Sequence, residues 1–324
     1  MKESLKEKAY RTIRNKLTGK DMGNWYRGGL PLITNDDANA TISKAIQSAT
    51  PYMIARLGSV EIKPLLYYSE LKHFQTSKLR KLYFAGDIDY IFDKEKYDSY
   101  MADILHNNAG FFPKKTELLG AFADRMLQDI GEMDLCGAWL NEYLLRDKFK
   151  KNTLFCELGA LEPYDYATPW TESLTSKKVL VIHPFASTIE KQFNQRDKIW
   201  GNPMILPDFS LSTIRAVQSI AGETVTYDTW FSALEDMERN MDNLDYDVAL
   251  IGCGAYGLPL AAHAKRTGHI GIHLGGPLQI LFGIKGRRWD NIPSVSRYYN
   301  EYWVRPSESE TPERNHVVEN GCYW

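Results

Sequence analysis

Two glycine turns in the second half of the chain constrain its fold more than any other feature. Residues 247–286 indicate a strand, a glycine turn, a helix, a second strand, a second glycine turn and another helix. The apolar run at 248–251 precedes the first turn, and a segment rich in Ala and Leu follows it. Alternating strands and helices of this kind predict a parallel sheet in an α/β fold. Turns at the ends of such strands are places where phosphates bind.

The first turn has the spacing of a dinucleotide-binding motif. Gly252, Gly254 and Gly257 fit the pattern G-x-G-x-x-G after a strand and before a helix. An NAD site normally adds an acidic residue about 20 residues further on. The second strand ends instead in Gly275 and Gly276. We therefore expect a nucleotide-phosphate site without NAD. An NAD-linked Rossmann oxidoreductase and tight turns without a ligand remain alternatives.

Composition places the chain among ordinary globular proteins. It has 324 residues, 44% hydrophobic and 25% charged, and its net charge of -2 predicts no general attraction to nucleic acid. Its four cysteines lack the spacing of a metal site or a disulfide framework, which is typical of reduced thiols in a cytoplasmic protein. No apolar run approaches the roughly 18 residues of a membrane span. We expect a cytoplasmic protein.

The first 30 residues have a basic amphipathic pattern. Leu5, Ala9, Ile13 and Leu17 recur every four residues, while lysines and arginines occupy the other positions. This predicts a basic helix. Such a helix suits peripheral contact with an anionic membrane surface, packing on a partner, or a solvated position on the body of the protein.

A second candidate anion site follows the strand at 177–182. His183 comes at the carboxyl end of that strand, and Ser187 and Glu190 have the spacing of a capping box. His183 would then lie just before a helix N-terminus, where backbone donors and the helix dipole favour anions. A histidine satisfied by a backbone carbonyl is the alternative.

The remaining patterns complete the predicted domain. A short strand is expected at 204–206, a helix at 210–220, a strand at 224–227 and a helix at 230–244. These alternate as in a doubly wound sheet.

We expect one α/β domain over residues 31–300 that contains a helical insertion at about 70–150. The basic segment 1–30 precedes this domain, and an acidic tail over 301–324 follows it. Such a tail is either mobile or ordered by a partner.

A strand over 51–56 ends in a turn that carries Arg56, Gly58, Ser59 and Glu61. Charged side chains avoid the ends of buried strands unless they are paired or functional. Two interpretations are open: an ion pair between Arg56 and Glu61 that stabilises the turn, or a site for a ligand.

The residues of this turn carry a resemblance to a known family. Ile-Ala-Arg56-Leu-Gly58-Ser59-Val-Glu61, followed by Phe-Gln at 74–75 and a Lys/Leu-rich helix, resembles the Arg-Phe-Gly-Asp-Gly-Glu start of bacterial glycosyltransferases with the GT-D fold. The strand at 179–185 and the glycine-rich run at 252–286 are similar to GT-D-like proteins encoded with surface-polysaccharide genes. The resemblance extends from about 51 to 289. It implies a Rossmann-like GT-D sheet flanked by helices.

In that family a sugar is transferred from a UDP-sugar, and an Asp-x-Glu pair holds a divalent metal at the diphosphate. Glu61 matches the glutamate, Arg56 and Gly58 match their partners, and Ser59 replaces the aspartate. A serine hydroxyl is a poorer ligand for Mn²⁺ or Mg²⁺ than a carboxylate. Glu61 and the diphosphate alone would hold the metal, or positive groups such as Arg56 would replace it. Glu61 is alternatively the general base.

Two other carboxylate pairs have metal-like spacing. Asp87 and Asp89 have the Asp-x-Asp spacing of many nucleotide-sugar transferases, although capping of a helix after a glycine turn explains them better. Asp245 and Asp247 precede their strand, whereas open α/β sheets bind ligands beyond the carboxyl ends of strands.

We therefore expect a glycosyltransferase that moves a sugar from a UDP-sugar to a glycan or lipid-linked acceptor in surface-polysaccharide biosynthesis. A non-catalytic nucleotide-binding subunit is a further alternative. Tyr256 would stack on the base or sugar, or pack in the core, and the basic cluster Lys285, Arg287 and Arg288 would meet phosphates or solvent. Glu61 is the expected catalytic residue. The expected binding residues are Arg56, Gly58, Ser59, His183, Gly252, Gly254, Tyr256, Gly275, Gly276 and Gln279.

Overall fold

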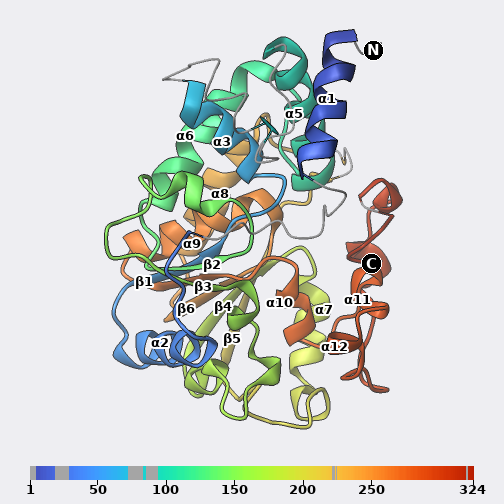
Figure 1. Ribbon diagram of the computed structural model, residues 1–324. Helices are drawn as coiled ribbons and strands as arrows, with labels where there is room; N and C mark the ends of the chain where they lie inside the picture. The colour runs from blue at the N-terminus through green and yellow to red at the C-terminus, as the bar shows by residue number, and fades with distance from the viewer. Residues whose placement is uncertain are drawn as a thin grey trace.

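A single parallel sheet forms the centre of the molecule (Figure 1). Within the described part of the chain it has seven strands in the order β3-β2-β1-β7-β6-β4-β5, and each neighbouring pair is parallel. The computed structural model describes residues 5–18, 29–71, 83–84, 94–220, 223, 225–318 and 320–324. The strands are β1 (Tyr52–Arg56), β2 (Leu135–Ala138), β3 (Leu154–Glu157), β4 (Lys178–His183), β5 (Ser210–Arg215), β6 (Val248–Ile251) and β7 (Ile270–His273).

Helices cover both faces of this sheet (Figure 1). One layer contains α3 (Ile62–Leu71), α5 (Lys94–Ala109), α6 (Leu119–Ile130), α8 (Trp230–Asp242) and α9 (Gly257–Arg266). The other contains α2 (Asn35–Ser48), α7 (Ala186–Phe193) and α10 (Pro277–Leu281). The basic helix α1 (Leu5–Thr18) lies beside α5, and α11 (Arg287–Asp290) and α12 (Pro293–Ser296) lie near the C-terminus.

The sequence of the central strands explains their position between two helical layers. β6 and β7 are buried at every residue, and β4 is buried after its first. Continuous apolar runs of this kind are typical of parallel strands covered on both faces, since neither side needs polar residues. The predicted α/β class with a Rossmann-like parallel sheet is confirmed.

The chain leaves neighbouring strands toward opposite faces. After β1 and β6 it enters the layer of α3 and α9, whereas after β4 and β7 it enters the layer of α7 and α10. Connections that diverge in this way open a crevice at the carboxyl ends of the strands, where open α/β sheets bind ligands.

Several predicted elements are wrong. Ser210–Arg215 is the edge strand β5 rather than the start of a helix, and 204–206 forms no strand. Leu211 and Thr213 alternate with Ser210 and Ser212, a pattern that suits a half-exposed edge, and the β-branched Thr213 and Ile214 favour a strand. The strand β2 lies inside the range 70–150 that was expected to be a helical insertion.

The C-terminal segment is packed on the body of the protein rather than forming a separate tail. The side chains of Trp303, Val318, Cys322 and Trp324 are buried. Backbone hydrogen bonds reinforce the contact, including one of 2.7 Å from the Lys285 amide to the Val304 carbonyl. Tertiary packing, which local composition does not reveal, holds residues 301–324 in place.

Two further expectations concern the whole chain. All four cysteines are buried thiols, and none of them forms a disulfide. Within the described ranges, none of the helices has the length and apolar character needed to traverse a lipid bilayer.

Candidate functional site

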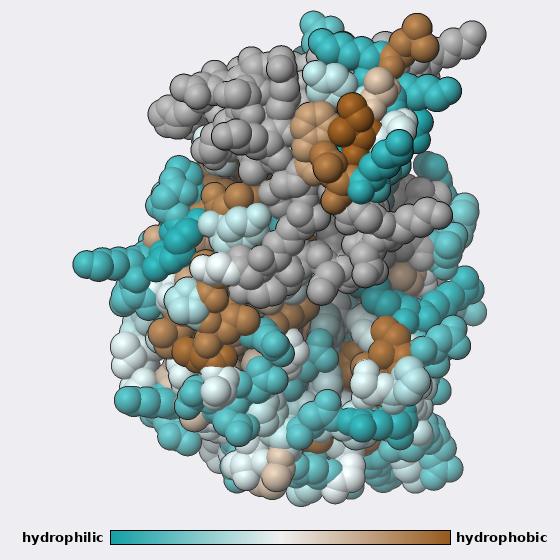
Figure 2. All heavy atoms as spheres, viewed as in Figure 1, coloured by the Kyte–Doolittle hydropathy of each residue, from teal (hydrophilic) through white to brown (hydrophobic). Residues whose placement is uncertain are grey.

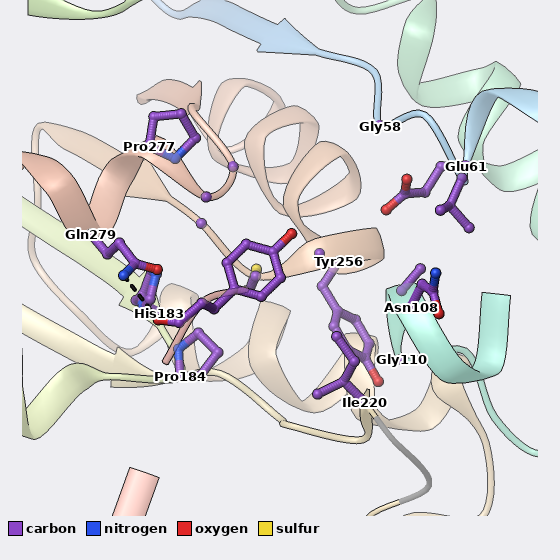
Figure 3. A pocket seen from close by; sticks show the side chains of 18 of the residues that line it. Gly58, Glu61, Asn108, Gly110, His183, Pro184, Ile220, Tyr256, Pro277 and Gln279 are labelled. Atoms are coloured by element: carbon purple, nitrogen blue, oxygen red, sulfur yellow. Dashed lines mark hydrogen bonds between the residues drawn. The ribbon is translucent and has the colours of Figure 1, made fainter. Parts of the chain in front are cut away.

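A cavity of about 530 Å³ opens at the carboxyl ends of β1, β7, β6 and β4 (Figure 3). Its volume lies within the range of small-molecule sites. Many separate parts of the chain contribute to its wall, and the structure brings together every residue that the sequence predicted for the site. These are Arg56, Gly58, Ser59, Glu61, His183, Gly252, Gly254, Tyr256, Gly275, Gly276 and Gln279.

The turn after β1 directs Glu61 into this cavity (Figure 3). The amide of Ile62 donates to the Gly58 carbonyl at 3.0 Å, which starts α3 immediately after the turn. The Glu61 side chain folds back over Gly58, where an added Cβ would lie 1.9 Å from Oε2 of Glu61. Glycine at position 58 is therefore what lets the carboxylate reach its position.

Trp139 holds Arg56 at the end of β1. The guanidinium lies over the indole ring of Trp139, 4.6 Å from its centroid. The indole N–H of Trp139 donates to the Leu57 carbonyl at 2.9 Å, and Nη2 of Arg56 donates to the same oxygen at 3.3 Å. Burial lowers the pKa of Arg56, and the nearby Glu61 charge opposes this effect.

The proposed ion pair between Arg56 and Glu61 does not form, because the acceptor of the guanidinium is the Leu57 carbonyl. A half-buried guanidinium whose only acceptor among the described residues is one backbone oxygen is well placed to bind an anion.

Packing accounts for the glycines of the G-x-G-x-x-G motif. A Cβ on Gly252 would lie 2.7 Å from the Gly275 carbonyl, and one on Gly257 would lie 2.1 Å from the His273 ring. Gly254 has a positive φ of 57° and approaches the last carbonyl of α5, that of Ala109. The second glycine of an NAD motif approaches pyrophosphate, but here it faces the protein itself. The spacing of these glycines is therefore weak evidence for an NAD site.

The second glycine pair lets other side chains approach the backbone. Gly275 has a positive φ of 69°, and a Cβ there would lie 3.5 Å from Cδ of Arg56. A Cβ on Gly276 would lie 2.9 Å from the ring of Tyr323. This pair therefore brings β1 and the C-terminal segment to the same wall of the cavity.

Two histidines in the cavity wall are neutral. Burial lowers the pKa of His183 to about 3, and burial together with the Arg56 charge lowers that of His273 to about 3. The Phe185 amide donates to Nδ1 of His183 at 3.0 Å. A neutral ring that accepts at Nδ1 carries its proton on Nε2. His183 therefore presents a hydrogen-bond donor.

A carboxylate of the protein occupies the helix N-terminus that follows β4. Oε1 of Glu310 accepts from the amides of Ser187 and Thr188 at 2.8 and 3.2 Å, and Oε2 accepts from the hydroxyls of Thr188 and Ser307. Burial disfavours ionisation of Glu310, but these hydrogen bonds outweigh it and lower its pKa. At the helix N-terminus where the sequence predicted an anion site, Glu310 takes the place of a ligand anion. The predicted capping box of Ser187 and Glu190 does not form.

Tyr256 is better explained by packing than by ligand stacking. Its ring is 1% exposed and stacks on Trp230, with centroids 5.3 Å apart and an interplanar angle of 13°. Its hydroxyl lies 3.5 Å from Oγ of Ser219. The alternative of a core aromatic is therefore favoured.

The three residues of the predicted basic cluster do not all line the cavity. Arg288 lines the cavity, with its guanidinium 4.9 Å from the ring centroid of Tyr323. Arg287 donates to the Asn320 carbonyl, and Lys285 lies over Tyr299 outside the cavity.

The described lining does not fit a divalent cation held by the protein. Glu61 is the one acidic side chain among the described cavity residues, whereas Arg56, Lys63 and Arg288 are basic. No group of three or more His, Cys, Asp or Glu side chains within the described ranges is arranged to hold a metal ion. Mg²⁺ and Mn²⁺ prefer several oxygen ligands.

The two Asp-x-Asp pairs with metal-like spacing do not belong to the described lining of the cavity. Asp87 and Asp89 lie outside the described residues, as does the Phe-Gln pair at 74–75. Asp245 forms an ion pair with Lys178, and Asp247 accepts from the Lys178 amide at 2.8 Å, at the amino end of the sheet.

Trp139, Tyr323 and Trp324 also line the cavity, although the sequence did not predict them there. Trp139 follows β2, so recognising that strand would have placed Trp139 at the same edge as Arg56. Tyr323 and Trp324 carried no local signal, because only long-range packing brings the C-terminal segment to the cavity.

Comparison of the chain with models of protein families, with curated protein sequences and with solved structures yields no match.

Proposed function

We propose that the protein is a glycosyltransferase that transfers a sugar from a UDP-sugar to a glycan or lipid-linked acceptor in bacterial surface-polysaccharide biosynthesis. One observation carries this proposal. Among the described residues, the cavity at the carboxyl ends of four adjacent parallel strands combines one carboxylate, Glu61, with the basic side chains Arg56, Lys63 and Arg288. The resemblance of the turn at 54–61 to the start of GT-D glycosyltransferases supports it.

Each group has a role in the proposed reaction. Glu61 accepts the proton of an acceptor hydroxyl while that oxygen forms a bond to C1 of the donor sugar. The bond from C1 to the β-phosphate oxygen breaks, and its electron pair leaves with the UDP. Arg56 and Arg288 stabilise the negative charge of the departing diphosphate. Because the described residues offer a cation one carboxylate, no step is assigned to a metal.

Helix α1 supports a lipid-linked acceptor at a membrane surface. The side chains of Leu5, Ile13 and Leu17 are exposed, and Lys6 and Lys16 are on the same helix (Figure 2). A helix with exposed apolar residues and lysines binds in the interface of anionic lipids.

Transfer assays with a panel of nucleotide-sugars test the proposal. We expect UDP release from at least one UDP-sugar, both with Mn²⁺ and with EDTA. Loss of a general base slows a reaction by about 10²- to 10⁴-fold, so Glu61→Gln should remove transfer while UDP binding persists. Ser219→Ala, which removes a hydroxyl bonded to the Gly110 carbonyl, serves as a matched cavity variant and should retain transfer.

The outcomes separate the alternatives. Undiminished transfer by Glu61→Gln would refute its role as base. Binding of UDP without transfer to any acceptor would favour a non-catalytic nucleotide-binding subunit. Absence of binding to every nucleotide tested would overturn the proposal.

A further inference from the structure

Gln279 has a buried acceptor that the protein leaves unused. Its side chain is fully buried on α10, and Nε2 donates to the Ile284 and Tyr323 carbonyls at 3.2 and 3.1 Å. Carbonyl oxygens only accept, so these two bonds fix which end of the amide is the nitrogen. Oε1 has no hydrogen-bond partner among the described residues. An unsatisfied buried acceptor destabilises the folded protein, and a hydrogen-bond donor on a ligand would remove that cost.

His183 provides the complementary donor. Nδ1 accepts from the Phe185 amide, so the proton lies on Nε2, and none of the described residues accepts from it. The ring is 4% exposed and lines the same cavity as Gln279.

The two side chains lie next to each other (Figure 3). His183 ends β4, and Gln279 belongs to the helix that follows β7. Gly252 lies against both elements: a Cβ there would lie 2.9 Å from Cδ2 of His183 and 3.0 Å from Cβ of Leu278, the residue before Gln279.

We propose that His183 and Gln279 recognise the hydrogen-bonding edge of a nucleobase, which for the UDP-sugar of the proposed function is the O4 and N3–H edge of uracil. Oε1 of Gln279 accepts from N3–H, and Nε2–H of His183 donates to O4. This inference rests on the proposed function and adds the specificity-determining residues.

The spacing of the sheet suits this arrangement. The ends of β4 and β1 are separated by β6 and β7, which at about 4.8 Å between strands places His183 roughly 14 Å from Arg56. An extended nucleoside diphosphate can bridge such a distance, with its base at His183 and its diphosphate at Arg56.

Calorimetric titration with three probes tests the proposal: UDP, UDP methylated at N3, and pyrophosphate. Methylation at N3 removes the donor that Gln279 requires, so we expect the methylated probe to bind wild-type protein about tenfold more weakly or worse. This comparison uses only the wild-type protein, so it does not depend on whether a variant folds.

Gln279→Met and His183→Phe complete the test. Each should weaken UDP binding by a similar factor and leave pyrophosphate binding unchanged. In Gln279→Met the N3-methyl group should have no further effect, as expected when both changes remove one interaction. Gln128→Met, an exposed glutamine on α6, is the matched control and should bind all probes as wild type does.

Equal binding of UDP and its N3-methyl analogue by the wild-type protein would overturn the assignment and leave the proposed function intact. The assignment would also be overturned if Gln279→Met bound UDP and its N3-methyl analogue with the same preference as the wild-type protein. Binding of pyrophosphate alone would refute base recognition and the UDP-sugar donor, and binding of none of the probes would refute the proposed function itself.

Discussion

The charge of Arg56 interacts with two carboxylates, Glu61 and Glu162, and forms an ion pair with neither. Burial raises the pKa of Glu162 to about 7, although the Arg56 charge opposes this rise. Glu162 therefore changes charge in the physiological range, close to the guanidinium that the proposed function assigns to the diphosphate.

We predict that UDP binding weakens as the pH rises from 6 to 8. Ionised Glu162 partly neutralises the positive potential at Arg56, and one charge several Å away changes affinity on the order of fivefold. Titrations of UDP at several pH values measure the effect. Part of the pH dependence of binding comes from the titration of UDP itself. Glu162→Gln should abolish the remaining part, and an unchanged profile in this variant would contradict the prediction.

Glu310 should stabilise the fold. Glu310→Ala leaves the Ser187 and Thr188 amides without their acceptor, so we expect the free energy of unfolding to fall by about 2–3 kcal/mol. Since ionisation is favoured in the folded state, this contribution is full above the unfolded-state pKa of 4.5 and is lost as the pH falls through the lower folded-state value. Urea unfolding at pH 7 measures it.

The matched control is Glu308→Ala, which removes an exposed carboxylate from the same turn. It should change the stability by less than about 0.5 kcal/mol. Equal effects of the two substitutions would show that the cap contributes nothing specific.

At the scale of elements, α1 presents its apolar positions to solvent. Leu5 is 89% and Leu17 67% exposed. Contacts through Arg14, whose Nε donates to the Tyr83 carbonyl at 3.0 Å, hold the helix to the body without covering these leucines.

We predict that the protein binds vesicles containing anionic lipid and that Leu5→Ser combined with Leu17→Ser reduces the bound fraction. Burial of a leucine in the interface contributes about 1.5–3 kcal/mol, so the double variant should bind at least tenfold more weakly. Flotation with neutral and anionic vesicles measures this. Ile292→Ser, at an exposed apolar residue outside α1, is the control. Binding that is indifferent to the leucines would disprove the role of α1.

Some elements could be predicted from the sequence and others could not. β6 and β4 were identified because their apolar runs are continuous and end in glycine or a helix start. β2 was missed because Leu-Cys-Gly-Ala is short and contains no β-branched residue. Positions at strand ends, such as His183, could be assigned to one cavity by the rule for open sheets, whereas Tyr323 depends on packing far along the chain.

At the scale of the whole molecule, the cavity wall joins distant parts of the chain. Arg56, His183, Gly252 and Tyr323 line one space, so a ligand that filled it would lie against all four regions.

We therefore predict that UDP slows amide hydrogen exchange in all four regions together: 56–61, 183–185, 252–256 and 320–324. A ligand that stabilises the folded state also slows exchange throughout the protein, because global opening becomes rarer. The protection of these four regions must therefore exceed the protection of α2, which lies away from the cavity. Mass spectrometry of peptic peptides measures this. Protection confined to one region would contradict a site that spans the sheet.

The position of β1 has a consequence for how the molecule is made. β1 lies in the middle of the sheet, and Tyr52 pairs with Ile270, a residue that the ribosome adds more than two hundred positions later. An emerging chain therefore holds a buried strand with one edge unpaired for most of its synthesis, and such an edge favours association with other chains. The free edge of β1 is therefore open to association until β7 has been made.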